Sequence, residues 1–206
     1  KGKNFYKKLG AEENNIWINY ELNLKTDNNN FNMKTVTIRE ITINDITKLQ
    51  HIGKLTFSET FSTDNNEEDM KEYLETSFSI EKIKTELQDK NSVFYFAEYN
   101  DEPLGYLKLN WGQSQTEIKT ENSLEIERIY VLKEFHGKKI GQLLFEKALE
   151  IAQIKNVNYI WLGVWEYNKK AIHFYEKNGF VAFDKHVFKL GNDVQTDIMM
   201  KRDFNS

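Results

Sequence analysis

The feature that most constrains this chain is a strand, a glycine-containing turn and a long helix in direct succession between residues 124 and 152. The stretch LEIERIYVL, residues 124–132, is rich in β-branched and alternating apolar residues, which is typical of a β-strand. The turn that follows contains Gly137 and Gly141. Apolar residues then recur at helical spacing and predict an amphipathic helix; they are Ile140, Leu143, Leu144, Ala148, Ile151 and Ala152. This succession predicts an α/β domain.

The turn between that strand and helix is a candidate anion-binding site. The first N–H groups of a helix are unpaired and carry partial positive charge, and glycine lets the backbone approach a ligand. Lys138 and Lys139 add positive charge, so the turn suits a pyrophosphate. It matches neither the P-loop nor the dinucleotide-binding fingerprint, since Gly137 and Gly141 are its only glycines. The alternative is an ordinary glycine turn before a helix.

The polarity of the strand changes halfway along it. Glu125 and Glu127 alternate with apolar residues, but Ile129 and Val131 then continue the same parity as the two glutamates. A β-bulge near Glu127 or Arg128 would produce this change, and bulges often lie beside active sites. Both glutamates are candidate bases if they face a cleft. The alternative is an edge strand with one solvated face.

The rest of the chain predicts further elements around this unit. Thr42 or Asn44, Ser79 and Asn168 are each placed to cap a helix, and Gly179 to end the last one. An acidic loop leads into another short helix. Strands are expected at 35–41, on both sides of an Asn-Asp-Glu-Pro turn between 92 and 112, at 159–165, at 180–189 and at 194–202.

Composition narrows the possible functions. Hydrophobic residues make up 39% of the 206 residues, and the formal charge of -4 argues against nucleic-acid binding through bulk charge. The absence of cysteine excludes disulfides and cysteine nucleophiles. No apolar run reaches membrane-span length and no signal-peptide core is present, so we expect a cytoplasmic protein. We also expect no metal, because no ligand spacing links His51, His136, His173 and His186.

The N-terminal part is set apart by composition. An Asn-rich stretch, residues 23–32, precedes Met33, so we predict an extension over 1–32 and one domain over 33–206. The phrase FYKKLG at residues 5–10 also resembles FYEKNG at residues 174–179, which raises the question of whether the chain contains a duplication.

Together these motifs resemble the GNAT superfamily of acyl-CoA N-acyltransferases, in element order over residues 33–203. The turn resembles the family's pyrophosphate motif, Gln/Arg-x-x-Gly-x-Gly/Ala, with His136 at the first position, Lys139 at the first Gly and Gly141 at the last. VWEYNKKAIHFYEKNGF resembles the next motif, with Asn168 and Tyr175 in place. The resemblance implies a mixed, mostly antiparallel twisted sheet of about seven strands flanked by about four helices, with splayed central strands forming the acetyl-CoA cleft.

The resemblance implies acetyl-CoA as co-substrate and assigns its contacts. The backbone of Ile129 and Val131, with Tyr130 between them, would hold the pantetheine arm like an added strand. Asn168, Ala171 and Tyr175 would lie at the thioester end. Backbone N–H groups would bind the pyrophosphate, from the turn made of His136, Gly137, Lys138, Lys139, Ile140, Gly141 and Gln142.

It also implies an acid and a base. Tyr175 would give a proton to the departing CoA thiolate, since phenol and thiol have ordinary pKa values of ~10 and ~8.5. An alkylamine with a pKa of ~10.4 must lose a proton before it attacks. Glu127 or Glu125, directly or through water, would remove that proton. The N–H of Ile129 would stabilise the oxyanion.

The acceptor is expected to be a small cationic amine. The stretch from 57 to 87 resembles the PaiA-type spermidine/spermine N-acetyltransferases, which implies a polyamine. Asp64 and Glu67 would attract its ammonium groups, and Trp111, Trp165 and Tyr167 would contact its charge or methylenes. The alternative for the acidic residues is a solvated helix start.

Other interpretations stay open at this point. The acceptor could be a protein N-terminus or lysine, or the domain could be a non-catalytic acyl-CoA-binding regulatory module. We expect no nucleic-acid or membrane partner, and a homodimer is compatible with the resemblance. Residues 5–24 look like the tail of another acetyltransferase, and without a cofactor turn Tyr6 would have no catalytic role. Our hypothesis is a remnant of an upstream tandem enzyme; the alternative is an extension whose strand pairs with a sheet edge or a neighbouring subunit.

Overall fold

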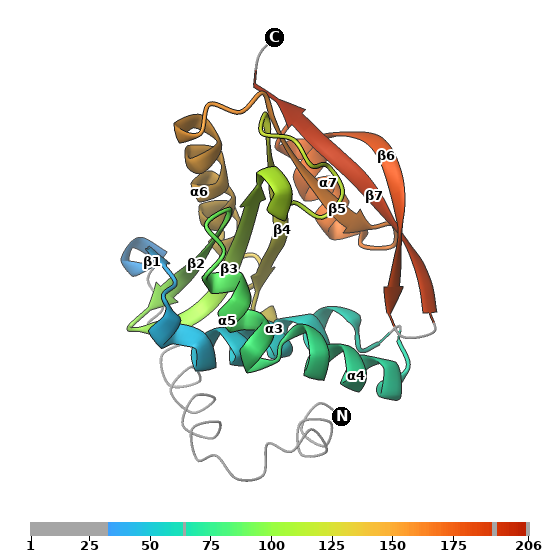
Figure 1. The fold of residues 1–206 in the computed structure, drawn as a ribbon. Helices are drawn as coiled ribbons and strands as arrows, with labels where there is room; N and C mark the ends of the chain where they lie inside the picture. Colours follow the sequence, from blue (N-terminus) through green and yellow to red (C-terminus); the bar gives the residue numbers. More distant parts are fainter. Residues whose placement is uncertain (1–32, 64, 191–192, 205–206) are drawn as a thin grey trace. The chain divides into compact units, whose positions relative to one another are not determined.

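The computed structural model describes residues 33–63, 65–190 and 193–204 (Figure 1). The chain divides into two units, Lys1–Thr35 and Val36–Ser206. Of the first unit the described part is a single 3₁₀ turn, η2 (Met33–Thr35). The predictions for the N-terminal extension and for Asp64 therefore lie outside the described residues.

A seven-stranded sheet forms the framework of the described part of the second unit, in the order β1-β2-β3-β4-β5-β7-β6. Neighbouring strands are antiparallel except β4 and β5, which run parallel. The predicted mixed, mostly antiparallel sheet is therefore confirmed. The strands are β1 (Thr37–Glu40), β2 (Ser92–Tyr99), β3 (Glu102–Trp111), β4 (Ser123–Val131), β5 (Tyr159–Trp165), β6 (Val181–Leu190) and β7 (Asp193–Asp203).

The described residues form five α-helices, one more than the resemblance implied. Ser79 and Asn168 cap two of them as predicted, because their side chains accept hydrogen bonds from the first turn. Gly179 follows the last helix with φ +84°, a left-handed conformation that ends it. The helices are α3 (Ile46–Phe61), α4 (Glu67–Ser77), α5 (Ile80–Leu87), α6 (Ile140–Ile154) and α7 (Lys169–Lys177).

Helices α6 and α3 cover opposite faces of the sheet. A Cβ built on Gly105 of β3 would lie 3.2 Å from Leu144 of α6 and 3.1 Å from Val131 of β4, so this side of both strands faces α6. Tyr130, the neighbour of Val131, lies with its ring centroid 6.4 Å from that of Phe57 of α3. Consecutive side chains of a strand point to opposite faces, which places α3 across the sheet from α6.

The sheet opens between its two parallel strands. β4 and β5 pair only through Ser123–Glu125 and Tyr159–Trp161, although both strands continue beyond this point (Figure 1). The predicted splay of the central strands is thus confirmed. From Ile126 onward, no described strand pairs with the edge of β4 that faces β5, so this edge is open to other partners.

A β-bulge interrupts β4 on its other edge. Lys108 pairs with Arg128 and Leu109 pairs with Ile126, which leaves Glu127 as the extra residue and confirms the predicted bulge. The extra residue changes which side chains face α3. As a result Glu125, before the bulge, and Arg128, after it, lie on the same face of the sheet.

Candidate active site

A cavity of about 1270 Å³ lies at the opening between β4 and β5. Its wall combines α3, both strands, the loop before α6, α7 and the β6–β7 pair. The structure brings together there most of the site residues that the sequence predicts. They are Glu125, Glu127, Ile129, Tyr130, Val131, His136, Gly137, Lys139, Gly141, Gln142, Trp165, Asn168, Ala171 and Tyr175.

The loop between β4 and α6 turns backbone N–H groups toward one end of the cavity. The N–H of Lys138 donates to the carbonyl of Phe135 at 3.3 Å, and that of Gln142 to the carbonyl of Lys139 at 3.1 Å. These two groups are therefore used within the loop. In the described part of the chain, the loop N–H groups with no backbone acceptor are those of Gly137, Lys139, Ile140 and Gly141.

Left-handed backbone conformations give the loop its shape. Gly137 has φ +77° and Lys139 has φ +64°, the region that favours glycine. The resemblance expects a glycine at position 139, and this φ is a physical reason for it. The side chains of two predicted binding residues turn away: Lys138 Nζ lies 4.6 Å from the ring centroid of Phe135, and Ile140 is 1% exposed. Ile140 can therefore contribute only its backbone N–H, whereas in this conformation Lys138 offers neither its side chain nor its N–H, which already donates to Phe135.

The free edge of β4 offers backbone groups to an extended ligand. The N–H of Leu132 donates to the carbonyl of Leu104 at 2.9 Å, so even-numbered residues here pair with β3. Backbone groups alternate between edges, and those of Ile129 and Val131 therefore point into the opening. His136 Nε2 donates to the carbonyl of Val131 at 2.8 Å. Among the described residues, both N–H groups and the carbonyl of Ile129 have no partner and are open to a ligand.

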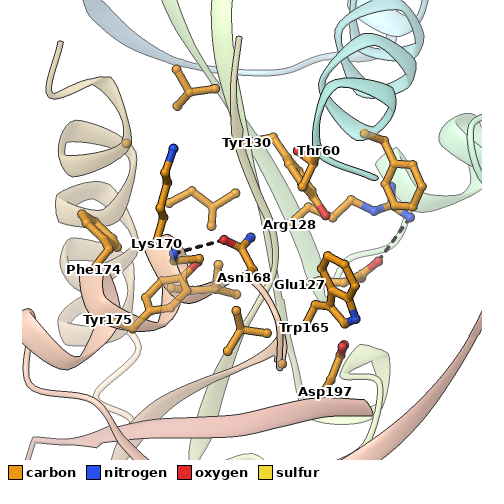
Figure 2. A pocket seen from close by; sticks show the side chains of 18 of the residues that line it. Thr60, Glu127, Arg128, Tyr130, Trp165, Asn168, Lys170, Phe174, Tyr175 and Asp197 are labelled. Carbon is orange, nitrogen blue, oxygen red and sulfur yellow. Dashed lines mark hydrogen bonds and ion pairs between the residues drawn. The ribbon is translucent and has the colours of Figure 1, made fainter. Parts of the chain in front are cut away.

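Helix α7 presents Asn168 and Tyr175 to the cavity. The Asn168 side chain accepts a hydrogen bond from the N–H of Ala171 at 3.2 Å, and Figure 2 shows it beside Tyr175. Tyr175 is 7% exposed, with its ring against Phe174 and Phe180. Burial raises the pKa of the Tyr175 phenol well above its ordinary value, so the hydroxyl keeps its proton at neutral pH.

Glu125 is a buried carboxylate held by neutral donors. It accepts hydrogen bonds from the N–H of Thr116 at 2.9 Å and from Asn110 Nδ2 at 3.0 Å, and a third, short one from the Thr116 hydroxyl. Burial raises its pKa, and the charge of Glu127 adds to this, while the hydrogen bonds oppose it. A carboxylate whose pKa is raised is a stronger proton acceptor, which suits a general base.

Glu127 lies in a different environment. It accepts from Asn110 Nδ2 at 2.5 Å and pairs with Lys108 Nζ at 2.6 Å and Arg128 Nη2 at 3.3 Å; Figure 2 shows the pair with Arg128. Burial alone would raise its pKa, but the charges of Arg128 and Lys108 lower it below the ordinary value. The bulge residue is therefore a fixed anion rather than a ready proton acceptor.

Near Glu127, three side chains form a row across β5, β7 and β6. Trp165 pairs with Asp197, and Asp197 with His186. His186 Nε2 lies 3.4 Å from the Glu117 carboxylate in the β3–β4 loop. A Cβ at Gly163 would lie 3.4 Å from the Asp197 carboxylate, so the glycine makes room for it.

Asp197 is the member of this row whose carboxylate has no hydrogen-bond donor or ion-pair partner among the described residues. Burial raises its pKa, and His186 only partly opposes this. Figure 2 shows the carboxylate directed toward Trp165. A half-buried carboxylate in this position is suited to an external cation.

Three predicted acceptor residues lie away from the cavity lining. Glu67 is exposed in the first turn of α4, and Tyr167 is 67% exposed. Trp111 ends β3 with its ring under Lys155, whose Nζ lies 3.2 Å from the centroid. Conversely, the sequence prediction missed Asp197 and Glu117. No local pattern marks them, because the place of Asp197 depends on strand register and that of Glu117 on how the β3–β4 loop folds.

The chain matches the acetyltransferase (GNAT) family over residues 54–180. An uncharacterized N-acetyltransferase, from the pepI 3' region of Lactobacillus delbrueckii subsp. lactis, is 40% identical over 170 residues, which cover 82% of this chain and 98% of the relative. The spermidine N(1)-acetyltransferase of Thermoplasma acidophilum is 26% identical over 154 residues, which cover 73% and 91%. The crystal structure of the PaiA N-acetyltransferase from Thermoplasma acidophilum in complex with coenzyme A aligns with a TM-score of 0.68 at 24% identity, over 82% of this chain and 99% of that one.

The chain therefore belongs to the GNAT family of acetyltransferases and is an N-acetyltransferase. The structural likeness independently shows the same fold. None of the described helices has the length and apolar character that crossing a membrane requires.

Proposed function

We propose that this enzyme transfers an acetyl group from acetyl-CoA to a primary amine of a polyamine, by direct attack in a ternary complex. The observation that carries the proposal is the cavity between β4 and β5. One end is lined by backbone N–H groups of the loop before α6, and the other by carboxylates and aromatic rings. An anionic donor and a cationic acceptor can thus approach one another from opposite ends.

The residues present fit acetyl-CoA as the donor. The free N–H groups of Gly137, Lys139, Ile140 and Gly141 suit a pyrophosphate. Ile129 and Val131 offer the backbone groups that an amide-containing pantetheine arm needs. When bound, acetyl-CoA supplies an activated acyl group on sulfur. The chain's own residues supply its orientation and the proton transfers.

The proposed acid, Tyr175, and the proposed base, Glu125, act from different sides of the opening between β4 and β5. Tyr175 holds the proton that the departing thiolate needs. Burial raises the pKa of the phenol, so it is neutral in the free enzyme and gives up its proton only to the charge that develops on sulfur. Glu125 receives the proton from the amine, directly or through water, because its pKa is raised whereas that of Glu127 is lowered. The N–H of Ile129 donates to the oxyanion that develops on the acetyl carbonyl.

The acceptor end supports a polyamine. Asp197 and Glu117 join Glu125 around the same space, and Trp165 lies in the row with Asp197. A long cation can place one amine at Glu125 and a second ammonium at Asp197, with methylenes against Trp165. These residues replace Glu67, Trp111 and Tyr167 of the sequence prediction. The spermidine N(1)-acetyltransferase of Thermoplasma acidophilum gives this acceptor a precedent among the relatives.

Acetyl-CoA turnover over an acceptor panel tests the proposal. The panel contains spermidine, spermine, a simple alkylamine, a lysine peptide and a peptide with a free N-terminus. We expect turnover with the polyamines, and a ~10²-fold lower kcat in Tyr175→Phe because the acid is lost. The matched control is Tyr159→Phe, which lies outside the cavity lining.

Two results would contradict the proposal in different ways. Tight CoA binding without turnover of any acceptor would indicate a non-catalytic module. Turnover of peptides but not of spermidine or spermine would retain the enzyme and overturn the polyamine acceptor. A Tyr175→Phe variant as fast as wild type would remove Tyr175 as the acid.

A further inference from the structure

Four alternating charges form a closed ring behind the acceptor end of the cavity. Lys108 Nζ lies 3.1 Å from Glu86 Oε2 and 2.6 Å from Glu127 Oε2. Arg128 closes the ring, with Nη1 at 3.2 Å from Glu86 Oε2 and Nη2 at 3.3 Å from Glu127 Oε1. The ring ties α5, through Glu86, to β3 and to the bulge of β4.

The ring is a buried structure. The exposed fractions of its side chains are 5% for Lys108, 9% for Glu86, 12% for Arg128 and 18% for Glu127. Aromatic rings lie against both cations: Phe94 is 5.4 Å from Lys108 Nζ, and Phe78 is 5.1 Å from the Arg128 guanidinium. Charges removed from water in this way are tolerated when they are paired, and two anions with two cations leave no surplus.

The ring has an inner and an outer half. Glu127 and Arg128 line the cavity, whereas Glu86 and Lys108 do not. Asn110 connects the ring to the proposed base, because its Nδ2 donates to both Glu127 and Glu125. A change at Glu86 can therefore reach the acceptor end without touching a ligand.

We infer that Glu86 is a positioning residue for acetyl transfer: it orients Lys108 and Arg128 around Glu127 and cancels the positive charge that these cations would otherwise place beside the acceptor. The inference rests on the proposed amine acceptor. Without Glu86 the three remaining charges sum to +1. That surplus repels a cationic acceptor and stabilises the ionised form of Glu125.

Other charged and titratable groups lie near the ring and contribute to its electrostatics. Lys82 Nζ lies 3.5 Å from Glu86 Oε1 at the exposed side of α5. The phenols of Tyr73, Tyr106 and Tyr130 interact with the charge of Arg128, and burial raises the pKa of all three, so they stay neutral near pH 7. The carboxylate of Asp89 interacts with the charge of Lys108, and its hydrogen bonds to Ser114 and Asn91 lower its pKa. The groups around Glu125 itself are Asn110, Thr116, Glu127 and its strand partner Trp161.

The test compares Glu86→Gln with Glu86→Asp and with Glu81→Gln, an exposed glutamate of the same helix. In Glu86→Gln we expect the KM for spermidine to rise ~10-fold while the KM for acetyl-CoA is unchanged, since one uncompensated charge acts on the cation. The fall in kcat on the acid side of its pH profile should move to lower pH, because the surplus positive charge stabilises the ionised form of Glu125. Glu86→Asp keeps the charge and should retain most of the acceptor affinity, and Glu81→Gln should match wild type.

A second substitution separates charge from packing. Lys108→Gln added to Glu86→Gln restores a net charge of zero in the ring, and we expect the spermidine KM to return to within about three-fold of wild type. Thermal unfolding of every variant checks that each one folds. A uniform loss of kcat at all pH values, with unchanged spermidine KM and no rescue, would overturn the inference.

A direct readout keeps the inference separate from the proposed function. The carboxyl carbon of Glu125 can be titrated by ¹³C NMR in wild type and in Glu86→Gln, with Glu125→Gln used to assign the signal. We expect a lower Glu125 pKa in Glu86→Gln, and an unchanged pKa would overturn the inference even if no amine is turned over. Absence of amine turnover in wild type would instead contradict the proposed function.

Discussion

The two ends of the cavity are built from different parts of the chain. The proposed donor end consists of backbone N–H groups of one loop and one strand edge, from a continuous stretch between Ile129 and Gly141. The proposed acceptor end consists of side chains from β4, β5, β6, β7 and the β3–β4 loop. A backbone site depends on conformation, whereas a side-chain site depends on residue identity at each position.

This difference explains which departures from the family motif the loop can accept. His136 stands in place of Gln or Arg and bonds the Val131 carbonyl, and Lys139 adopts the left-handed conformation that a glycine would have. In both cases the free N–H groups are kept. At the proposed acceptor end, by contrast, we expect the loss of a single carboxylate to weaken the role that its side chain has.

The largest effect that we expect at the proposed acceptor end comes from substituting Glu125. Glu125→Gln keeps the shape and the hydrogen-bond acceptor but removes the base, so kcat should fall ~10²-fold with little change in acetyl-CoA KM. In wild type, kcat should fall as the pH is lowered through the raised pKa of Glu125, because the carboxylate takes up a proton. Steady-state kinetics against pH measure both. The control is Glu150→Gln, an exposed glutamate of α6 outside the lining.

The same substitution should stabilise the fold. A carboxyl whose folded pKa lies above its unfolded value destabilises the protein wherever it is ionised, and this cost disappears once the pH falls below the unfolded pKa. Glu125→Gln should therefore raise the thermal midpoint at pH 7 and leave it nearly unchanged at acid pH. A lower midpoint at pH 7 would indicate that the hydrogen bonds to Thr116 and Asn110 outweigh burial.

A smaller effect is expected at Asp197. Asp197→Asn should raise the KM for spermidine ~10-fold, since the second ammonium loses its counter-ion, and should leave the KM for a simple alkylamine within about two-fold. Because burial raises the pKa of Asp197, the wild-type preference for spermidine should weaken as the pH is lowered through that pKa. Asp184→Asn, at an exposed position of β6, is the control. Equal effects on both amines would remove Asp197 as the second anchor.

The smallest effect tests the donor end. Lys139→Gly should raise the free energy of unfolding by ~1 kcal/mol, because the residue is already left-handed at φ +64°. The KM for acetyl-CoA should change less than about three-fold if the N–H groups carry the binding. Lys138→Gly, at a neighbour whose φ is not positive, should instead destabilise by ~0.5–1 kcal/mol. A ten-fold rise in acetyl-CoA KM for Lys139→Gly would place the phosphate contact on the side chain.

Much of the fold and the donor end could be predicted from sequence because their signals are local. The parity change around Glu127 indicated the bulge, Asn168 and Gly179 marked the limits of α7, and glycine placement marked the loop. Each is decided by residues within a few positions of one another. The assignment of roles to Tyr175 and the loop N–H groups remains a prediction that kinetics must test.

The acceptor end could not be predicted in the same way. Asp197 enters the cavity because β7 pairs between β5 and β6 in a particular register, and Glu117 because a loop folds toward His186. The acidic stretch before α4 carried the stronger local signal, yet Glu67 is exposed at a helix start. Likewise, Glu125 and Glu127 are equivalent in the sequence, and only their partners separate their pKa values.

The bulge at Glu127 has a consequence for how this enzyme can vary. The bulge depends on the number of residues in β4 as well as on their identity. One extra residue decides which face of the sheet each later side chain of the strand points to. Deleting position 127 would restore a regular ladder and force either Glu125 or Arg128 to change faces. Substitution scans will therefore undervalue this position, and variants that differ by a single-residue insertion or deletion in β4 should differ in acceptor more than variants with many substitutions elsewhere.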